Sequence, residues 1–77
     1  MELREALMYI LSEYTGVKVT ENTLLVDLPI DSLDHAELAC QFEFKYGIKA
    51  ENQQWMDLWS EPTHTVADLI KFVKDKL

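Results

Sequence analysis

Residues 28–46 read LPIDSLDHAELACQFEFKY, and this stretch decides the fold. Pro29 stops any preceding helix, because proline lacks an amide hydrogen and clashes with the previous turn. Asp31 and Ser32 then open a run whose apolar residues recur at helical spacing, so we expect a helix over Ser32–Tyr46. At 100° per residue, one side of this helix carries the residues expected to face the core. These are Leu38, Ala39, Phe42 and Tyr46.

The same helix carries a second apolar strip. It consists of Leu33, Ala36, Cys40 and Phe44. The strip starts beside Ser32 and is flanked by the carboxylates of Glu37 and Glu43. Because a helix needs only one apolar face to join a small bundle, the second strip indicates a partner surface. The alternative is that the strip packs beneath the segment that follows the helix.

A first helix is expected near the start of the chain, ending at Gly16. Its core stripe consists of Leu3, Leu7, Ile10, Leu11 and Tyr14. Residues 17–19 alternate like a strand, but they are few and the sequence offers no second strand to pair with them. We therefore expect a long packed loop before the second helix, held to the core by Leu24, Leu25 and Leu28.

Two shorter apolar patterns complete the chain. Residues 52–60 predict a short helix, with Pro62 just beyond its end. Its inner side carries Trp55, Leu58 and Trp59. A last helix should begin after Thr65, with a stripe formed by Val66, Leu69, Ile70 and Val73. The predicted fold class is all-α: a small four-helix bundle of three longer helices and one short third helix, with a long loop between the first two helices.

Length and composition narrow the fold and the classes of partner that this chain can have. The 77 residues, 48% of them hydrophobic, predict a single domain over 1–77 with a small core. Cys40 is the only cysteine, so no disulfide within the chain can reinforce that core, and a lone thiol suits the cytoplasm. Seven basic and fourteen acidic residues give a net charge of −7. This charge argues against binding nucleic acid or anionic membranes and favours partners with basic surfaces, although acidity can also serve solubility alone.

The sequence predicts a monomer that does not insert into membranes. No apolar run approaches the roughly 18 residues of a membrane span. The opening residues, Met1-Glu2-Leu3-Arg4, begin a charged helix rather than a signal peptide.

The ionisable residues do not predict an enzyme or a metal site. His35 and Cys40 are five residues apart on one helix, which places them about 140° apart around its axis, too far to act as a nucleophile and base. His64 falls in an expected loop, and no Cys or His cluster has the spacing of metal ligands. The acidic residues Asp27, Asp31, Asp34 and Glu37 match no calcium-binding loop, so a solvated acidic face is the simpler interpretation.

Ser32 is the residue best placed for chemistry. It should lie on the first turn of its helix, where unpaired backbone N–H groups and the helix dipole favour an attached phosphate. The alternative is purely structural, because Asp and Ser are common N-caps and Asp31 with Asp34 resembles a capping box.

The chain as a whole resembles an acyl carrier protein. The resemblance rests on Asp31-Ser32-Leu33 and on the lead-in Asn22–Leu28, and it extends to Tyr46-Gly47-Ile48 and Thr65-Val66. It implies that Ser32, flanked by Asp31 and Leu33, carries 4′-phosphopantetheine attached from coenzyme A by a phosphopantetheinyl transferase. The arm would hold acyl groups as thioesters for fatty-acid, polyketide or related biosynthetic enzymes.

The resemblance also implies which residues meet the partners and the cargo. Acyl-transferring or condensing enzymes with basic docking surfaces would bind the second helix, through Asp34, Ala36, Glu37, Cys40, Glu43 and Phe44. In this family an acyl chain can enter a cleft between the second and third helices, and the candidate residues for that pocket are Phe42, Trp55 and Trp59. Two indoles there would shorten the cleft, unless they only complete a thin core.

Three departures from the family pattern suggest a specialised member. Pro29-Ile30 stands where glycine and a small residue are common, and Glu43-Phe44-Lys45 replaces a densely acidic helix end. The segment between Ile48 and Thr65 is also longer than usual. Two alternatives remain: an unmodified acidic helical adaptor, and a peptidyl or aminoacyl carrier, which more often has Gly-Gly-His or Gly-Gly-Asp before the serine.

Overall fold

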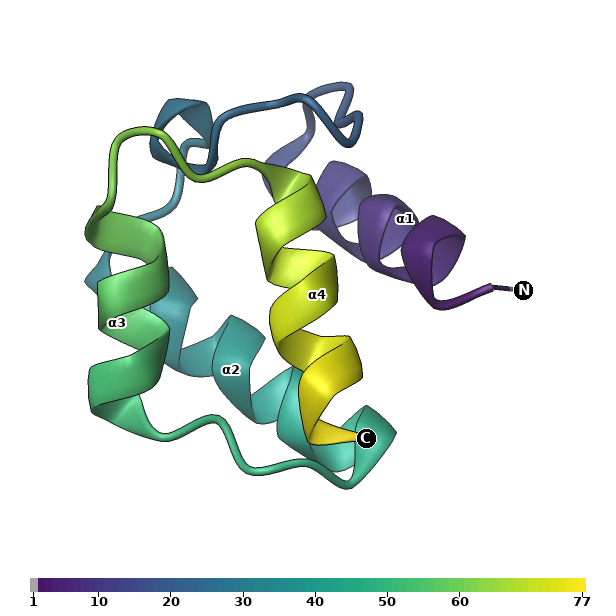
Figure 1. Cartoon of the computed structure of the whole chain (residues 1–77). Coiled ribbons are helices and arrows are strands. Elements are labelled where there is room, and N and C mark those ends of the chain that lie inside the picture. The colour runs from purple at the N-terminus through teal and green to yellow at the C-terminus, as the bar shows by residue number, and fades with distance from the viewer. Residues whose placement is uncertain (1) are drawn as a thin grey trace.

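The computed structural model describes residues 2–77, which form four α-helices and one 3₁₀ turn and contain no strand (Figure 1). The helices are α1 (Leu3–Thr15), α2 (Ser32–Tyr46), α3 (Asn52–Ser60) and α4 (Val66–Lys76). The 3₁₀ turn, η1, covers Leu25–Asp27 within the long loop between α1 and α2. The predicted all-α bundle, with its short third helix and long first loop, is confirmed. No helix in the described part of the chain is long and apolar enough to cross a bilayer.

Two helices end at glycines in the left-handed region. Gly16 follows α1 with a φ of 73°, and Gly47 follows α2 with a φ of 64°. A Cβ atom at either glycine would meet no atom within 4 Å, so the backbone conformation rather than the available space favours glycine there. These two ends fix the lengths of α1 and α2.

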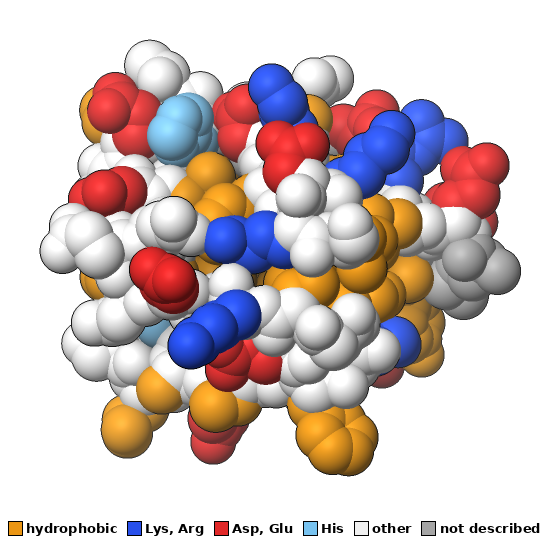
Figure 2. All heavy atoms as spheres, turned by 60° about the horizontal axis from the view of Figure 1, so that its bottom comes forward, with side chains coloured by type: hydrophobic (Ala, Val, Ile, Leu, Met, Phe, Trp, Pro, Cys, Tyr) orange, Lys and Arg blue, Asp and Glu red, His pale blue; other side chains and the backbone are white. Residues whose placement is uncertain are grey.

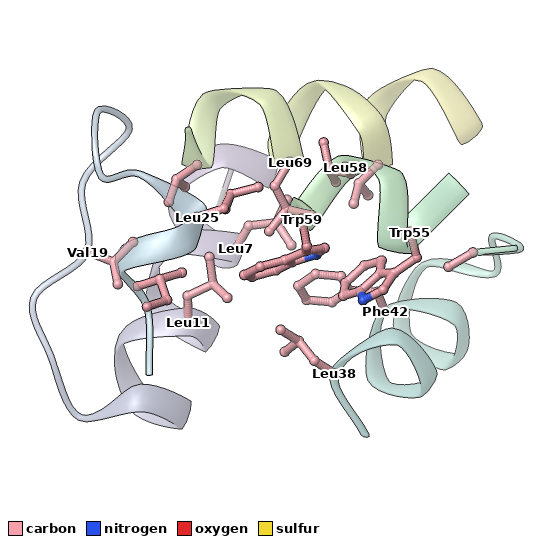
Figure 3. Packing of buried hydrophobic residues seen from close by; sticks show 14 of the residues in the cluster. Leu7, Leu11, Val19, Leu25, Leu38, Phe42, Trp55, Leu58, Trp59 and Leu69 are labelled. Carbon is pink, nitrogen blue, oxygen red and sulfur yellow. The ribbon is translucent and has the colours of Figure 1, made fainter. Parts of the chain in front are cut away.

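The core lies between α2 and the other three helices. Leu7 and Leu11 of α1, Leu38 and Phe42 of α2 and Leu69 of α4 are fully buried. Figure 3 shows the rings of Phe42, Trp55 and Trp59 side by side at the centre of this cluster. The ring centroids of Trp55 lie 5.9 Å from those of Phe42 and 5.6 Å from those of Trp59, so an aromatic contact joins α2 to α3.

The long first loop is held to the start of α4 by backbone hydrogen bonds. Leu25 N–H donates to the His64 carbonyl over 3.0 Å, and Val66 N–H donates to the Thr23 carbonyl over 2.9 Å. Ala67 N–H adds a bond to the Glu21 carbonyl over 3.0 Å. We call these bonds between residues 21–25 and 64–67 the loop strap. In Figure 1 the two segments run together along the top of the molecule.

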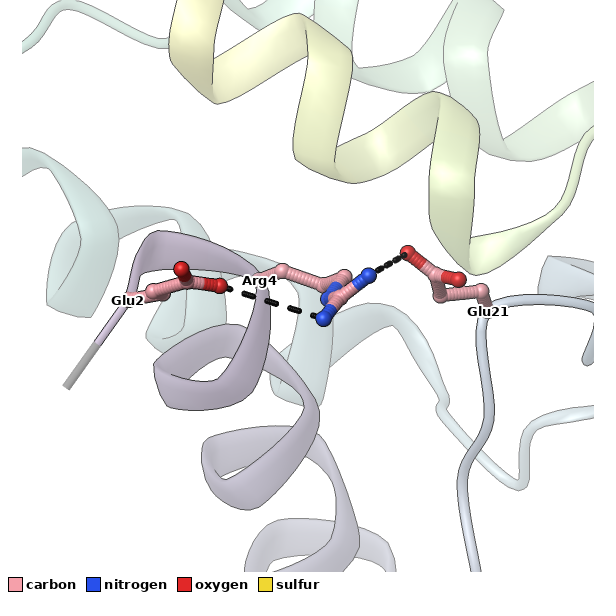
Figure 4. A network of polar contacts seen from close by, with 3 residues as sticks. All are labelled: Glu2, Arg4 and Glu21. Carbon is pink, nitrogen blue, oxygen red and sulfur yellow. Dashed lines mark hydrogen bonds and ion pairs between the residues drawn. The ribbon is translucent and has the colours of Figure 1, made fainter.

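The first loop is also attached by side chains. Of the three residues predicted to anchor the loop, Leu25 and Leu28 are buried in the core, whereas Leu24 is half-buried and is not among the residues packed against it. Arg4, near the start of α1, lies between Glu2 and Glu21, with N–O distances of 3.8 Å and 3.4 Å (Figure 4). These groups are largely exposed, and such surface pairs stabilise a fold only weakly. The buried leucines and the loop strap therefore provide most of the attachment.

Candidate functional site

Ser32 stands at the first position of α2 with its side chain exposed. Asp31, not Ser32, is the N-cap. Asp34 N–H donates to Asp31 Oδ1 over 3.0 Å, and Asp31 N–H donates to Asp34 Oδ2 over 3.1 Å, which completes a capping box. Because Asp31 performs the capping, Ser32 Oγ takes part in none of the hydrogen bonds found among residues 2–77. The reading of Asp31 and Asp34 as a capping box is correct, and it leaves the hydroxyl of Ser32 free.

The other two serines have different surroundings. Ser12 lies in the last turn of α1, where its Oγ accepts a hydrogen bond from Val19 N–H over 3.3 Å. Ser60 Oγ donates to the Met56 carbonyl over 2.6 Å at the last position of α3. Of the three serines, only Ser32 combines a helix start with an unengaged hydroxyl.

The start of α2 suits a phosphate group on Ser32 Oγ. The backbone N–H groups of Ser32 and Leu33 precede the first bonds of the helix, since the ladder begins with His35 N–H donating to the Asp31 carbonyl over 3.0 Å. Free N–H groups and the positive end of the helix dipole attract an anion. The carboxylates of Asp31 and Asp34 oppose this attraction, although both are already engaged in the capping box. The residues present therefore fit a phosphodiester that projects into solvent.

The second apolar strip of α2 is exposed along its whole length. Leu33 is 77% exposed and Phe44 is 93% exposed, and both Ala36 and Cys40 are also exposed. The alternative that the strip packs beneath the following segment is therefore wrong. Figure 2 shows one face of the molecule, on which hydrophobic side chains emerge in patches between acidic and basic ones. An uncovered strip of this kind, starting one residue from Ser32, is suited to contact another protein.

Three residues of the strip, Ala36, Cys40 and Phe44, line a groove between α1 and α2 with a volume of about 1040 Å³. Its lining residues are Tyr9, Ile10, Glu13, Tyr14, Ala36, Glu37, Cys40, Gln41, Phe44 and Lys45. The sequence interpretation did not include the α1 wall in the partner surface. Tyr9, which is 60% exposed, lies outside the core stripe of α1, and a large aromatic residue in that position is the signal that could have revealed it.

Tyr14 joins the two walls of this groove. Its hydroxyl lies 2.5 Å from Glu37 Oε2 and 3.1 Å from Asp34 Oδ1. A phenol has a single proton to donate, so the two carboxylates share one donor. The hydrogen bond to Glu37 is the main reason that the pKa of Tyr14 is raised, so the phenol stays protonated. The pKa of Asp34 is lowered, chiefly by the hydrogen bond from the Asp31 backbone N–H.

The predicted acidic partner residues therefore differ in their surroundings. Asp34 has both oxygens engaged, one by Tyr14 and one by Asp31. Glu43 is half-buried and accepts a hydrogen bond from Ala50 N–H over 2.9 Å, which ties the end of α2 to the segment before α3. Glu37 is exposed, and it is the carboxylate of this set that faces the groove.

A smaller cleft, of about 320 Å³, lies between α2 and α3 and begins at Ser32. Its lining residues are Ser32, His35, Ala36, Ala39, Ala50, Asn52, Trp55 and Met56. Of the three predicted pocket residues, Trp55 lies on its wall, whereas Trp59 and Phe42 are not among the lining residues and are buried in the adjoining core. The cleft is thus between the second and third helices, as expected, and three of its eight lining residues are alanines.

His35 is a residue of this cleft that the sequence interpretation missed. Its Nδ1 accepts a hydrogen bond from Trp55 Nε1–H over 3.1 Å. The imidazole also meets the Trp59 ring edge-on, with centroids 4.9 Å apart. Burial lowers the pKa of His35 and outweighs the opposing effect of Asp34 and Asp31. Its position one turn after Ser32 was visible in the sequence, but its indole partner, 20 residues away, was not.

Other ionisable residues add no further site. Among residues 2–77 there is no group of three or more His, Cys, Asp or Glu side chains that could hold a metal ion. His64 Nδ1 lies 2.7 Å from the Leu58 carbonyl in the connection before α4, and Cys40 is exposed on the apolar strip.

Known proteins resemble this chain over most of its length. No family model matches the chain. An acyl carrier protein of Thermotoga maritima is 39% identical over 72 residues, covering 88% of this chain and 83% of that protein. An acyl carrier protein of Rhodococcus erythropolis is 34% identical over 77 residues, covering 95% and 79%. A meromycolate extension acyl carrier protein of Mycolicibacterium smegmatis is also 34% identical, covering 95% and 73%. With this identity along most of its length, the chain belongs to the acyl carrier protein family and serves as a carrier of acyl groups, not as an enzyme.

Proposed function

We propose that residues 1–77 act as one acyl-carrier domain, in which Ser32 bears a 4′-phosphopantetheine arm. The single observation that supports this attachment is the free, exposed hydroxyl of Ser32 at the capped start of α2. The arm would supply a thiol that holds an acyl group as a thioester. Asp31 would keep the helix start formed, and Leu33, 77% exposed, would offer an apolar contact to the enzyme that attaches the arm.

The partners in this proposal are enzymes with basic docking surfaces. One is a phosphopantetheinyl transferase, and the others load, extend or remove the acyl group. The net charge of −7 and the exposed Glu37 favour such surfaces, while Ala36, Cys40 and Phe44 offer the apolar contact area. The names of several relatives refer to meromycolate extension, so enzymes that extend acyl chains are the first class to test. We place the reaction in the cytoplasm, where coenzyme A and the transferase would meet the carrier as a monomer.

The test of the attachment is a mass measurement. The purified chain is incubated with coenzyme A and a broad-specificity phosphopantetheinyl transferase, and its intact mass is compared before and after. One phosphopantetheine adduct is expected on the parent protein and none on Ser32→Ala. Ser12→Ala and Ser60→Ala are the matched controls and should each take one adduct, because neither serine lies free at a helix start.

The result also separates the carrier from its alternatives. An adduct that survives Ser32→Ala would show that the attachment site is elsewhere. If the parent chain gains no phosphopantetheine while an established carrier protein is modified in the same reaction, the alternative of an unmodified helical adaptor would be favoured.

A further inference from the structure

The hydrogen bond between His35 and Trp55 holds the two walls of the α2–α3 cleft together. Among residues 2–77 it is the one side-chain hydrogen bond that joins α2 to α3. Trp55 is only 2% exposed, so its indole N–H depends on this acceptor rather than on water. Both side chains line the cleft that begins at Ser32.

The geometry defines the protonation state of His35. An indole nitrogen can only donate, so His35 Nδ1 must be unprotonated to accept its hydrogen bond, and the proton of the neutral ring lies on Nε2. The aromatic residues of α3 that contact the ring are Trp55 and Trp59, and neither carries a charge. The charges of the Asp34 and Asp31 carboxylates, at the start of its own helix, also act on the ring. The imidazole that accepts the hydrogen bond from Trp55 is therefore the neutral one.

We infer that His35 and Trp55 make this carrier selective for acyl groups that bear a hydroxyl substituent over unsubstituted alkyl groups. The inference rests on the proposed attachment of the arm at Ser32, which places the cleft within reach of the cargo. His35 and Trp55 act here as specificity-determining residues, because they offer the cargo one donor and one acceptor that face each other.

The preference for a hydroxyl group follows from which hydrogen bonds each cargo can form with His35 and Trp55. A hydroxyl between the two side chains accepts from Trp55 Nε1–H and donates to His35 Nδ1, so both polar atoms stay satisfied. An oxo group accepts from the indole but leaves Nδ1 without a donor. An alkyl chain that parts the two rings satisfies neither, and an unsatisfied buried donor is costly. The expected order of stabilisation is hydroxyacyl, then oxoacyl, then alkyl.

The rest of the cleft is consistent with a small, oxygen-bearing cargo. Ala36, Ala39 and Ala50 provide a shallow apolar floor, and Asn52 adds a second polar side chain at the rim. The indole of Trp55 lies on the wall of the cleft, and that of Trp59 is buried in the adjoining core.

The test compares cargoes of equal length on the pantetheinylated protein. The transferase loads Ser32 with the butyryl, 3-hydroxybutyryl or 3-oxobutyryl form of 4′-phosphopantetheine from the matching acyl-coenzyme A, and thermal unfolding midpoints are measured at pH 7.5. We expect the hydroxyacyl form to unfold about 4 °C above the butyryl form, the shift that one additional net hydrogen bond gives in a domain of this size. The oxoacyl form should fall between them.

Variants test whether the difference in unfolding midpoint between the hydroxyacyl and butyryl forms depends on His35 and Trp55. His35→Leu removes the acceptor and Trp55→Phe removes the donor, so each should abolish the advantage of the hydroxyacyl form. His35→Asn, whose side-chain oxygen takes the place of Nδ1, should retain part of it. His64→Asn is the matched control for loss of an imidazole elsewhere and should leave the difference unchanged. Equal stabilisation by all three cargoes, or a difference that survives His35→Leu, would overturn the inference.

A second measurement keeps this inference separate from the attachment itself. If Ser32 takes no arm, the proposed function fails, but the cleft can still be tested with the unmodified protein. Free S-(3-hydroxybutyryl)-pantetheine and S-butyryl-pantetheine are added at millimolar concentration, and the Trp55 indole N–H is followed by NMR. A larger shift with the hydroxy compound, absent in His35→Leu, supports selectivity, whereas identical responses to both compounds refute it.

Discussion

At the scale of a single residue, His35 links the stability of the fold to pH. Its pKa is lowered in the folded protein, mainly by burial, so the unfolded chain takes up a proton at a higher pH than the folded chain does. The stability that neutral His35 contributes is therefore complete above about pH 6.5 and is lost as the pH falls through the lowered folded value. We predict that the urea midpoint falls between pH 7.5 and pH 5, and that the fall is smaller in His35→Asn. Parallel curves for the two proteins would exclude this linkage.

Tyr14 provides a second prediction at this scale. Tyr14→Phe removes the hydroxyl that Glu37 and Asp34 share, so the two carboxylates lose the donor between them and α1 is held less firmly to α2. We expect a lower urea midpoint at pH 7 with an unchanged helical circular dichroism spectrum.

The contribution of Tyr14 should also depend on pH. Because the folded pKa of Tyr14 is raised above its ordinary value of 10.0, the hydrogen bond from its hydroxyl stabilises the fold below pH 10, and this stabilisation is lost as the pH rises further. The gap between parent and variant should therefore narrow in alkali, and a gap independent of pH would contradict this role. Tyr9→Phe, an exposed phenol on the same helix, is the control.

The residues around Ser32 show what a sequence can predict at this scale. Asp31, Ser32 and Asp34 lie within one turn, so their relation follows from local helix geometry, and the capping box could be predicted. The bonds from Trp55 to His35 and from Tyr14 to Glu37 join residues 20 and 23 positions apart. Such pairs depend on how the helices pack against one another. The apolar periodicity of each helix predicts which side is buried but not which residue of another helix lies opposite.

At the scale of the element, α2 is predicted to guide partners by charge. Glu37→Gln removes the exposed carboxylate of the groove but keeps an acceptor for Tyr14, and Glu37→Lys reverses the charge. We expect slower phosphopantetheine transfer in the order parent, Gln, Lys at low salt, with the rates converging as salt screens the interaction. Glu61→Lys, an exposed site just after α3, is the control with the same change in net charge. Rates that do not respond to either Glu37 substitution or to ionic strength would argue against electrostatic docking.

Helices were easier to predict than the segments between them. The extents of α2 and α3 match the sequence prediction, because Asp31 and Gly47 mark the two ends of α2 and Pro62 lies just beyond the end of α3. The turn η1 and the loop strap were not predicted, although the anchoring leucines were. The backbone hydrogen bonds of the loop strap form only where residues 21–25 and 64–67 meet after the helices pack. No pattern of side chains in the sequence predicts that meeting.

At the scale of the whole molecule, the two tryptophans are predicted to limit the length of cargo that the bundle can hold. Trp55 and Trp59 are buried and fill the space next to the cleft. Each methylene that an acyl chain buries should stabilise the protein by up to about 0.8 kcal/mol, so the gain in unfolding temperature should stop after a few carbons. Trp55→Ala or Trp59→Ala should shift that limit to longer chains, whereas Leu69→Ala on α4 should not. Continued stabilisation of the parent by long straight chains would contradict this prediction.

The loop strap has a consequence for how the bundle opens. It fixes the first loop to the start of α4 through three backbone hydrogen bonds, whereas α3 has nine residues and no side-chain cap at its start. Amide protons of Leu25, Val66 and Ala67 should therefore exchange with solvent only when the whole chain unfolds, and those of α3 should exchange through a smaller, more frequent opening. In such an opening α3 moves away from α2 while the strapped part stays folded. The cleft beside Ser32 would then receive or release its cargo without unfolding the carrier.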